Sequence, residues 1–483
     1  MFFKINKNQI IEYTIILFFI FLGFYLRYLN LFFESYWVDE IIGFGQADPN
    51  ISIKETLERN IFKHDDRSEQ TPILFHFLIK YFYKFFGYNP DNGKIFTLIL
   101  GLAAIPFAHL TAKEINAKKS SYLLIFLICT NIYLINYSQE VRPYILLFLI
   151  SFVNIYTFFK VLNNYDRHEN SHIWNIVFIV VNVLGFLTHP FFLVIIVSEL
   201  FYCLVNIFLF KKKLLKISIL LALSFIFSLL IQYEYILSLI KLDNYWIDKP
   251  DIKFFLDFFF PRFFGSKIMG IIYFITLVSL VYSYRKKIFF NSHYLVFILI
   301  IFFSYFLPLL YGFIRMPILH DRYIIFVLIP VMILISVFIC EIKNTKVRIT
   351  AILILCLSTS ANLFLEIKNK TTYKPELNKL MTSIVKLSEE GFEKNIFINE
   401  EKNPPYLHNY LIKYPHFVDN NFNLLKKDEE LRENSFWLIC YEWFIKNAPE
   451  NENCLNFDSG EKMKVKKVLT VKKIVGKYYS KSN

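Results

Sequence analysis

The sequence predicts a polytopic, all-α membrane domain of about eleven transmembrane helices, followed by a small C-terminal α/β domain. Two observations carry this prediction. Of the 483 residues, 55% are hydrophobic and 19% are aromatic, which is far more apolar than a soluble chain of this length requires. Apolar runs of about 20 residues, the length that crosses a hydrocarbon core, recur from Ile10 to Glu366 and then stop. We therefore expect residues 1–368 to form the membrane domain and residues 369–483 to form a separate polar domain.

The apolar runs give the expected helices in order. They cover residues 9–31, 92–112, 120–138, 141–162, 173–188, 189–210, 214–240, 268–284, 292–313, 322–341 and 347–366. The first run has no small-residue cleavage site, which favours a signal anchor over a removed signal peptide. The run 71–88 is also apolar, but His76, Lys80 and Lys84 recur every four residues in one polar stripe. We therefore expect 71–87 to be a juxtamembrane helix that lies in the interface, with its lysines at headgroup level.

Lys and Arg residues concentrate in alternate connections between these helices, which the positive-inside rule assigns to the cytoplasm together with the N-terminus. They are Lys4, Lys7, Lys113, Lys118, Lys119, Lys160, Arg167, Lys211, Lys212, Lys213, Lys216, Arg285, Lys286, Lys287, Lys343, Lys346 and Arg348. The first outer loop (32–91) and the C-terminal domain then face outward. The formal net charge of +13 thus reflects topology, and because the basic residues form no basic domain we expect no nucleic-acid partner.

The C-terminal region has the pattern of a small α/β domain. Apolar residues at helical spacing predict a helix over Pro375–Glu390. Strands are expected at Asn395–Asn399, Phe436–Tyr441 and Lys464–Val475. Cys440 and Cys454 fall in this polar region and would be able to form a disulfide if the domain faces an oxidising compartment.

Polar residues gather at the outer ends of the helices. The first group is Tyr36-Trp37-Val38-Asp39-Glu40, which follows the first span and Arg27. Adjacent carboxylates at a membrane surface suit a general base with a hydroxyl or metal partner, because desolvation and mutual repulsion raise one of their pKa values. The alternative is the solvated start of a loop. Trp37 favours function, because an interfacial anchor would fix the depth of the pair.

Three further groups lie on the same predicted side. They are Tyr137-Ser138-Gln139-Glu140-Val141-Arg142-Pro143-Tyr144, Thr188-His189-Pro190 and His320-Asp321-Arg322-Tyr323. Taken singly, each has an ordinary structural alternative: an ion pair that closes a hairpin, a capping His and an Arg that reaches toward lipid phosphates. With the Tyr36–Glu40 group they make four polar groups on one predicted side of the membrane, and the other side has only basic loops. This asymmetry indicates an outward-facing site.

These residues resemble the GT-C glycosyltransferases related to dolichyl-phosphate-mannose protein mannosyltransferases and to the bacterial lipid A aminoarabinose transferase. The order and spacing hold over roughly 10–340, and the YSQEVRPY string is the most specific part. The matching elements are Arg27, Trp37-Val38-Asp39-Glu40, Thr71-Pro72, Tyr137–Tyr144, Thr188-His189-Pro190 and Arg322-Tyr323. The resemblance implies an inverting transferase of the bacterial cytoplasmic (inner) membrane. Its donor would be a polyprenyl-phosphate sugar, and its acceptor a lipid, glycan or protein bound from the outer side. The C-terminal region matches no motif, so the identity of the acceptor is not inherited, and the sequence does not reveal the sugar.

The resemblance gives Asp39 the role of general base, with Glu40 adjacent. Because the leaving group is a phosphate, the site needs cations, and Arg142 and Arg322, together with Tyr323, are the expected donor-phosphate ligands. The residues expected to orient the acceptor or Arg142 are Glu140, Tyr137, His189, Arg27 and His320. A divalent metal at Asp39 and Glu40 stays open, because the spacing does not demand one.

Two other functions fit a polytopic chain of this kind. A flippase or transporter of lipid-linked glycans also needs cations for phosphate, but transporters usually place ionisable residues near the bilayer midplane, often in two similar halves. Here the polar groups sit at helix ends and no duplication is visible. A polymerase of lipid-linked glycans would share the outer-face location but would not predict both the WVDE and the YSQEVRPY strings.

Overall fold

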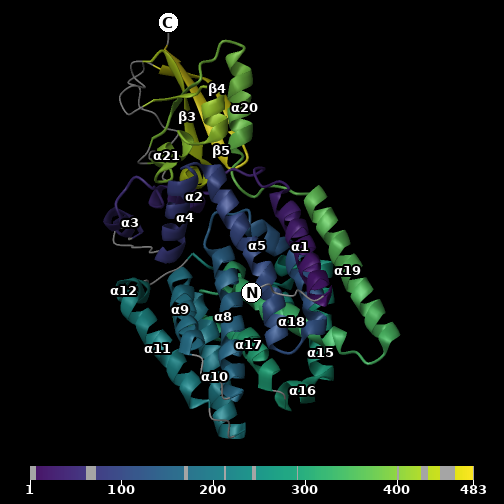
Figure 1. Cartoon of the computed structure of the whole chain (residues 1–483). Coiled ribbons are helices and arrows are strands. Elements are labelled where there is room, and N and C mark those ends of the chain that lie inside the picture. Colours follow the sequence, from purple (N-terminus) through teal and green to yellow (C-terminus); the bar gives the residue numbers. More distant parts are fainter. Residues whose placement is uncertain are drawn as a thin grey trace.

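The structure, a computed structural model, describes residues 7–60, 72–167, 172–210, 214–241, 246–290, 292–399, 402–425, 433–446 and 463–481. A large helical domain carries a small sheet domain at one end, as the sequence predicts (Figure 1). The helices of the large domain are α1 (Lys7–Tyr28), α5 (Pro90–Glu114), α6 (Ser121–Thr130), α7 (Ile132–Tyr137), α8 (Tyr144–Asp166), α9 (His172–Thr188), α10 (Leu193–Phe210), α11 (Leu215–Ile231), α12 (Tyr233–Lys241), α15 (Lys267–Ser283), α16 (Arg285–Phe290), α17 (Ser292–Ile314), α18 (Leu328–Cys340) and α19 (Thr345–Lys368).

Every one of the eleven apolar runs is helical, but they are not equally long. Within the described residues, seven helices are long and apolar enough to cross a membrane, and α11 with α12 make an eighth if that pair, bent by 76°, is one span. Helices α9 and α15 are apolar but have 17 residues each. The run 120–138 is broken at Asn131, whose side chain accepts a hydrogen bond from the Leu134 N–H (2.9 Å) and donates one to the Phe263 carbonyl (2.8 Å). The break divides the run into α6 and α7.

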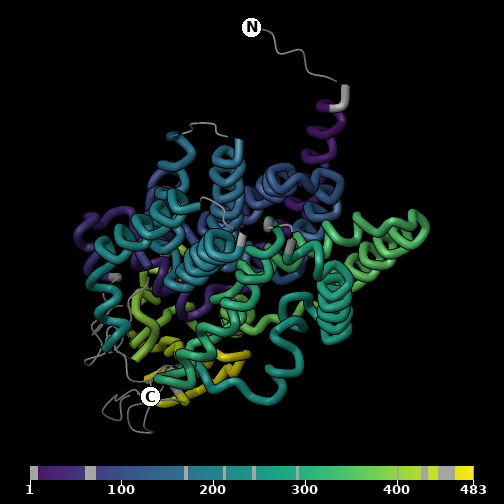
Figure 2. Tube along the Cα trace, turned by 90° about the horizontal axis from the view of Figure 1, so that it is seen from below, coloured from purple at the N-terminus to yellow at the C-terminus, as the bar shows by residue number. Residues whose placement is uncertain are grey.

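The helices differ in how deeply they lie in the domain. The candidate span Asp321–Cys340, which ends in α18, is enclosed on nearly all sides, with 94% of its most apolar stretch buried. Helices α15, α17, α6 and α19 pack around α18. In α1 and α19, by contrast, only 17% of the most apolar stretch is buried. In both views α19 lies at the margin of the domain (Figures 1 and 2). The exposed apolar faces of α1 and α19 are the surfaces that lipid would cover.

The first outer loop is itself helical, with α2 (Val38–Gln46), α3 (Ile53–Asn60) and α4 (Ile73–Phe86). Helix α4 takes the place of the expected juxtamembrane helix, although Thr71 lies outside the described residues. His76 and Lys80 of the polar stripe are buried, whereas Lys84 is exposed. The Lys80 ammonium donates to the carbonyls of Asp48 (2.8 Å) and Ile51 (2.6 Å) and to Thr56 Oγ1 (2.8 Å). Expecting the lysines of this stripe at headgroup level was therefore wrong for Lys80, because backbone carbonyls of the loop offered it better partners than lipid.

A charged cluster marks the opposite end of the domain. Glu12, near the start of α1, accepts hydrogen bonds from the ammonium groups of Lys113 (2.8 Å) and Lys118 (2.7 Å). Helix α1 ends at Tyr28, just before the outer loop, so Glu12 lies at the far end from that loop. Two of the lysines that the sequence assigned to the cytoplasm thus lie together on the side away from the sheet domain.

The C-terminal domain is an α/β unit, as expected. Its elements are α20 (Leu377–Ser388), β1 (Asn395–Phe397), α21 (Leu407–Leu411), α22 (Pro415–Asp419), β2 (Asn423–Leu425), β3 (Ser435–Tyr441), α23 (Glu442–Lys446), β4 (Met463–Val471) and β5 (Ile474–Lys481). The strand order is β2-β1-β3-β5-β4, with β1 parallel to β2 and β3, and with β5 antiparallel to β3 and β4. The expected strand Lys464–Val475 was wrong in one respect: a turn at Lys472-Lys473, where Lys473 has φ 58°, folds it into the β4–β5 hairpin.

The core of this domain forms where α20 packs on the hairpin. Trp437, Ile439 and Leu380 are fully buried there. Cys440 lies buried in β3 and is disulfide-bonded. Cys454 lies outside the described residues, so its pairing with Cys440 stays a prediction.

Two short helices, α13 (Ile252–Asp257) and α14 (Phe260–Phe263), follow α12 in the chain. They belong to the connection between α12 and α15. Arg262 of α14 pairs with Asp321 at 3.2 Å, which ties this connection to the entrance of α18.

Candidate active site

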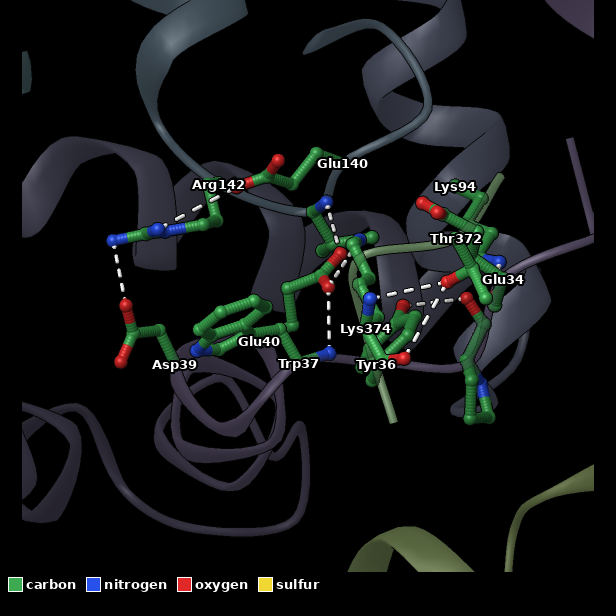
Figure 3. A network of polar contacts seen from close by, with 12 residues as sticks. Glu34, Tyr36, Trp37, Asp39, Glu40, Lys94, Glu140, Arg142, Thr372 and Lys374 are labelled. Carbon is green, nitrogen blue, oxygen red and sulfur yellow. Dashed lines mark hydrogen bonds and ion pairs between the residues drawn. The ribbon is translucent and has the colours of Figure 1, made fainter. Parts of the chain in front are cut away.

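The site is built where the first outer loop meets the loop between α7 and α8 (Figure 3). Helix α2 begins directly after Trp37, and the Glu40 carboxylate accepts a hydrogen bond from the Trp37 N–H at 2.8 Å. A carboxylate in this position stabilises the first turn of a helix, because the N–H groups there have no partner within the helix. This turn fixes the direction of the neighbouring side chain, Asp39.

Asp39 and Arg142 face each other across the two loops. One oxygen of the Asp39 carboxylate lies 2.8 Å from a guanidinium nitrogen of Arg142. Arg142 also lies 3.5 Å from the Glu140 carboxylate, so that the cation sits between two acids (Figure 3). The Asp39 side chain is 45% exposed. It can therefore be reached by a molecule that binds from outside.

Glu40 behaves differently from its neighbour, because its side chain is completely buried. One carboxylate oxygen accepts the Val141 N–H at 2.8 Å. The other oxygen accepts the Trp37 N–H and lies 2.5 Å from the Lys374 ammonium. Both oxygens are therefore committed to protein donors, and in this arrangement the pair Asp39 and Glu40 does not fit a shared metal. Within the described residues, no group of three or more His, Cys, Asp or Glu side chains could hold a metal ion.

Arg322 lies among aromatic rings, close to Arg142. Its guanidinium carbon is 4.8 Å from the Trp246 ring centroid, 5.4 Å from that of Tyr144 and 5.5 Å from that of Tyr323. Arg142 lies over the other part of this cluster, 4.9 Å from the Tyr144 centroid. Among the described residues no carboxylate pairs with Arg322, and its buried Nε has no hydrogen-bond partner. Two guanidinium groups with one free of an acid form a surface that suits an anion.

The remaining predicted residues line this cluster at different depths. Tyr137 packs edge-on against Tyr144 (5.5 Å), and the His189 ring lies 4.9 Å from the Tyr323 ring. The His189 Nδ1 accepts a hydrogen bond from the Phe191 N–H (3.2 Å), so this ring is held by its own turn. Burial raises the pKa of the Glu140 carboxyl above its ordinary value, while Lys374 and Arg142 act in the opposite direction.

Two predicted residues lie apart from the Asp39–Arg142 pair. Arg27 is buried between helices, where it donates to Ser138 Oγ (3.2 Å) and to the carbonyls of Cys129 (3.2 Å) and Ile128 (3.3 Å). It thus supports the 138–143 loop from inside the bundle. His320 lies 2.5 Å from Asp321, next to Arg262.

Sequence reasoning missed two residues of the site, Trp246 and Lys374. Trp246 comes from the connection 241–267, where its ring contacts both Arg322 and His320. Lys374 comes from the linker into the C-terminal domain and reaches Glu40 across 334 residues of sequence. A single Trp or Lys in a polar connection carries no periodic pattern, so only its position in space reveals it.

Comparison with known proteins agrees with this architecture. The family described as dolichyl-phosphate-mannose-protein mannosyltransferase matches residues 70–231, which include the 138–143 loop and His189. No curated protein matches the chain by sequence. ArnT from Cupriavidus metallidurans has a similar structure, with 10% identity over 96% of this chain and 97% of that protein: the TM-score is 0.60 for the apo form and 0.58 for the form bound to undecaprenyl phosphate.

The oligosaccharyltransferase from Archaeoglobus fulgidus, in complex with zinc and sulfate, is also similar. It shares 12% identity with a TM-score of 0.52 over 85% of this chain, and the chain spans 62% of its length. At these identities the likeness shows the fold. The GT-C resemblance of the sequence, which covers roughly residues 10–340, is thereby confirmed as a likeness of fold, and the family match adds residues 70–231.

Proposed function

We propose that this chain, a multi-pass membrane protein with the GT-C fold, is an inverting glycosyltransferase. It would move a sugar from a polyprenyl-phosphate carrier to an acceptor hydroxyl at the outer face of the bacterial cytoplasmic membrane. The observation that carries the proposal is the arrangement of two guanidinium groups beside one accessible carboxylate at the outer end of the helices. The ArnT structure with undecaprenyl phosphate supports a lipid phosphate as ligand of this fold.

Arg142 and Arg322 are the proposed ligands of the donor phosphate. A sugar phosphate already has a good leaving group, so transition-state stabilisation depends on cations at the phosphate oxygens more than on a general acid. The aromatic rings around Arg322 lie over its guanidinium group and shield it in part from water, which strengthens its interaction with an anion. The prenyl tail would stay in lipid beside the bundle, because the site lies where the spans end.

Asp39 is the proposed general base. The acceptor oxygen forms a bond to the anomeric carbon while the bond from that carbon to the phosphate oxygen breaks, and the hydroxyl proton passes to the Asp39 carboxylate. A single displacement of this kind inverts the anomeric carbon. In the structure Asp39 is paired with Arg142. A phosphate that draws Arg142 toward itself would leave the Asp39 carboxylate free to accept the proton.

Glu140, Tyr137, His189 and His320 are proposed to orient Arg142 and the acceptor around this centre, with Tyr323 beside the phosphate and with Arg27 supporting the loop. Glu40 is proposed to act on the geometry of α2 instead of on the proton, because both of its oxygens are already bonded.

The experiment compares wild type with Asp39→Asn in detergent, using a radiolabelled mixture of polyprenyl-phosphate sugars and a cell-envelope extract as acceptor. We expect label to leave the lipid carrier with wild type and the rate to fall about 10²- to 10⁴-fold in the variant, since positioned general bases contribute that much. Glu58→Gln, an exposed acid in α3 of the same loop, is the matched control. Equal transfer rates in wild type and Asp39→Asn would show that Asp39 is not the general base. No transfer from any such donor would favour a flippase, which moves the lipid-linked glycan unchanged.

A further inference from the structure

We propose that Lys374, in the linker that leads into the C-terminal domain, is a positioning residue of this site. Acting through Glu40, it would hold α2 against the 138–143 loop at the separation that brings Asp39 to Arg142. The C-terminal domain would then be part of the catalytic apparatus and not only an appendage. This inference rests on the proposed function for its kinetic consequence, whereas its structural consequence is independent of any activity.

The Glu40 carboxylate joins three separate parts of the chain. It accepts the Trp37 N–H of its own helix, the Val141 N–H 101 residues away and the Lys374 ammonium 334 residues away. Asp39 precedes Glu40 and Arg142 follows Val141, so one carboxylate fixes the spacing of the two backbones that carry the reacting pair (Figure 3). A shift of either backbone would change the Asp39–Arg142 distance directly.

A buried carboxylate of this kind needs a cation. The Glu40 side chain is completely buried, and burying a charge without a partner is costly enough that the surrounding structure rearranges. Among the described residues Lys374 is the one cation paired with Glu40, and its own side chain is 8% exposed. Burial alone would lower the pKa of Lys374, but Glu40, Glu140 and Glu34 raise it above its ordinary value. Lys374 therefore stays charged at neutral pH.

The C-terminal domain holds Lys374 in place. The Lys374 N–H donates to Thr372 Oγ1 (3.0 Å). The Lys472 and Lys473 ammonium groups, in the β4–β5 turn, donate to the carbonyls of Thr372 and Tyr373. The backbone just before Lys374 is therefore held by the β4–β5 hairpin.

The same hairpin also contacts the start of α2. The Lys473 ammonium lies 4.5 Å from the Trp37 ring centroid. The residue before Trp37, Tyr36, contacts helix α21 of the same domain. Its ring stacks on the Tyr410 ring at 5.1 Å, and the Tyr410 hydroxyl accepts a hydrogen bond from the Tyr36 N–H (3.2 Å). The C-terminal domain therefore contacts both Trp37, the residue directly before α2, and its neighbour Tyr36.

The test uses the full-length protein with Lys374→Met, and Lys379→Met as the matched control. Lys379 is an exposed lysine of α20 whose only recorded ion pair among the described residues is with Glu376 (2.8 Å). Hydrogen–deuterium exchange is measured on peptides that contain Trp37 and Val141. We expect their amides to exchange at least about 10-fold faster in Lys374→Met and at the wild-type rate in Lys379→Met, because an unneutralised carboxylate would leave its buried position.

The kinetic arm follows transfer from the lipid carrier. Lys374→Met should lower kcat about 10-fold or more with little change in KM for the donor, and Lys374→Arg should recover part of that loss. Because a smaller folded fraction would also lower the apparent kcat without changing KM, kcat is expressed per folded enzyme, taken from the monodisperse fraction in size-exclusion chromatography. Wild-type exchange rates together with wild-type kcat in a folded Lys374→Met variant would overturn the proposal.

A second variant covers the case in which Lys374→Met does not fold. The double variant Glu40→Gln with Lys374→Met removes both charges and keeps an amide oxygen for the Val141 N–H. We expect it to accumulate and to show slower exchange at Val141 than the single variant does. A double variant as defective as the single one would show that Lys374 does not act through Glu40. If wild type transfers no sugar while the exchange results hold, the proposed function fails and the positioning contact stands.

Discussion

Two adjacent acids, Asp39 and Glu40, have different environments although the sequence treats them alike. Glu40 points inward and is bonded by three donors, whereas Asp39 points outward to Arg142 and is partly exposed. Successive residues in the first turn of a helix point about 100° apart, so a single turn suffices to separate a structural acid from an accessible one. Of the two, Asp39 is the one whose carboxylate a bound molecule could reach, as its proposed role as base requires.

Arg322 gives a prediction at the residue scale that does not depend on knowing the sugar. Arg322→Lys should weaken binding of undecaprenyl phosphate about 10- to 100-fold, because an ammonium loses both the fork of N–H donors and the stacking on Trp246 and Tyr323. Binding is measured directly on the purified protein in detergent. Arg285→Lys is the matched control, since Arg285 also lies over a tyrosine ring (Tyr282, 4.4 Å) but belongs to a predicted cytoplasmic loop. Equal losses in both variants would contradict a specific phosphate site at Arg322.

Glu140 gives a prediction about pH. Because burial raises its pKa in the folded protein, the folded state binds the proton more strongly than the unfolded chain does. Wild-type stability should therefore fall as pH rises from about 4.3, the ordinary Glu pKa, through the raised value. Glu140→Gln cannot lose a proton, so its Tm relative to wild type should increase between pH 4 and pH 8.

Thermal unfolding of both proteins at a series of pH values checks this. Glu58→Gln, at an exposed position in the same outer loop, should change Tm little at either end of the range. A Tm difference between Glu140→Gln and wild type that does not vary with pH would show that Glu140 carries no burial penalty.

At the scale of elements, helix α2 carries the site because it fits closely between the membrane domain and the C-terminal domain. Gly45 permits this fit, since a Cβ at that position would lie 2.1 Å from the Tyr406 ring. On another face, a Cβ at Gly43 would lie 3.5 Å from His76 Nε2, which is an ordinary contact distance. The two glycines of one short helix thus differ in what they tolerate.

We therefore expect Gly45→Ala to destabilise the protein by about 1–3 kcal/mol through overpacking, and to lower the transfer rate because α2 must shift. Gly43→Ala should be neutral, or stabilising by up to about 1 kcal/mol, because alanine favours the helix. Thermal unfolding and transfer assays on the two variants measure the difference. Equal stability of the two variants would mean that α2 is not confined by Tyr406.

At the scale of the whole molecule, the outer ends of the helices, the first outer loop and the C-terminal domain form one continuous assembly. The contacts Tyr36–Tyr410, Trp37–Lys473 and Glu40–Lys374 all join the first outer loop to residues after 370. The sheet domain must therefore lie on the same side of the membrane as Asp39. This fixes the relative sides of the two parts independently of any count of spans.

The topology gives a further prediction. A C-terminal alkaline phosphatase fusion should be active, and a C-terminal fusion to a fluorescent protein that matures only in the cytoplasm should be dark, because the positive-inside rule places the loops with Lys118 and Arg285 in the cytoplasm. Fusions after Lys118 should give the reverse result. A fluorescent C-terminal fusion would show that the protein has the opposite orientation in the membrane, with the proposed site at the cytoplasmic face.

The sequence by itself determined the class of the protein, its apolar helices and the four polar groups that meet at one end. These features depend on local quantities: hydropathy over about 20 residues, the positions of Lys and Arg, and short strings such as YSQEVRPY. These quantities can be read from the sequence without knowing how the helices pack. The dependence on local pattern also explains why one strand was predicted at Lys464–Val475 where the structure has a hairpin. Polar and apolar residues keep alternating through the β4–β5 turn, so the pattern does not reveal where the chain reverses.

Tertiary structure alone decided which of the two acids is exposed, which cation neutralises the buried one and what surrounds Arg322. These outcomes depend on contacts between residues 101 and 334 positions apart, as for Glu40 with Val141 and with Lys374. The polar stripe of α4 shows the same dependence: its sequence fits lipid headgroups and protein carbonyls equally well, and the neighbouring loop supplies the carbonyls. A side chain's role is set by the partners that packing brings to it, and packing is a property of the whole fold.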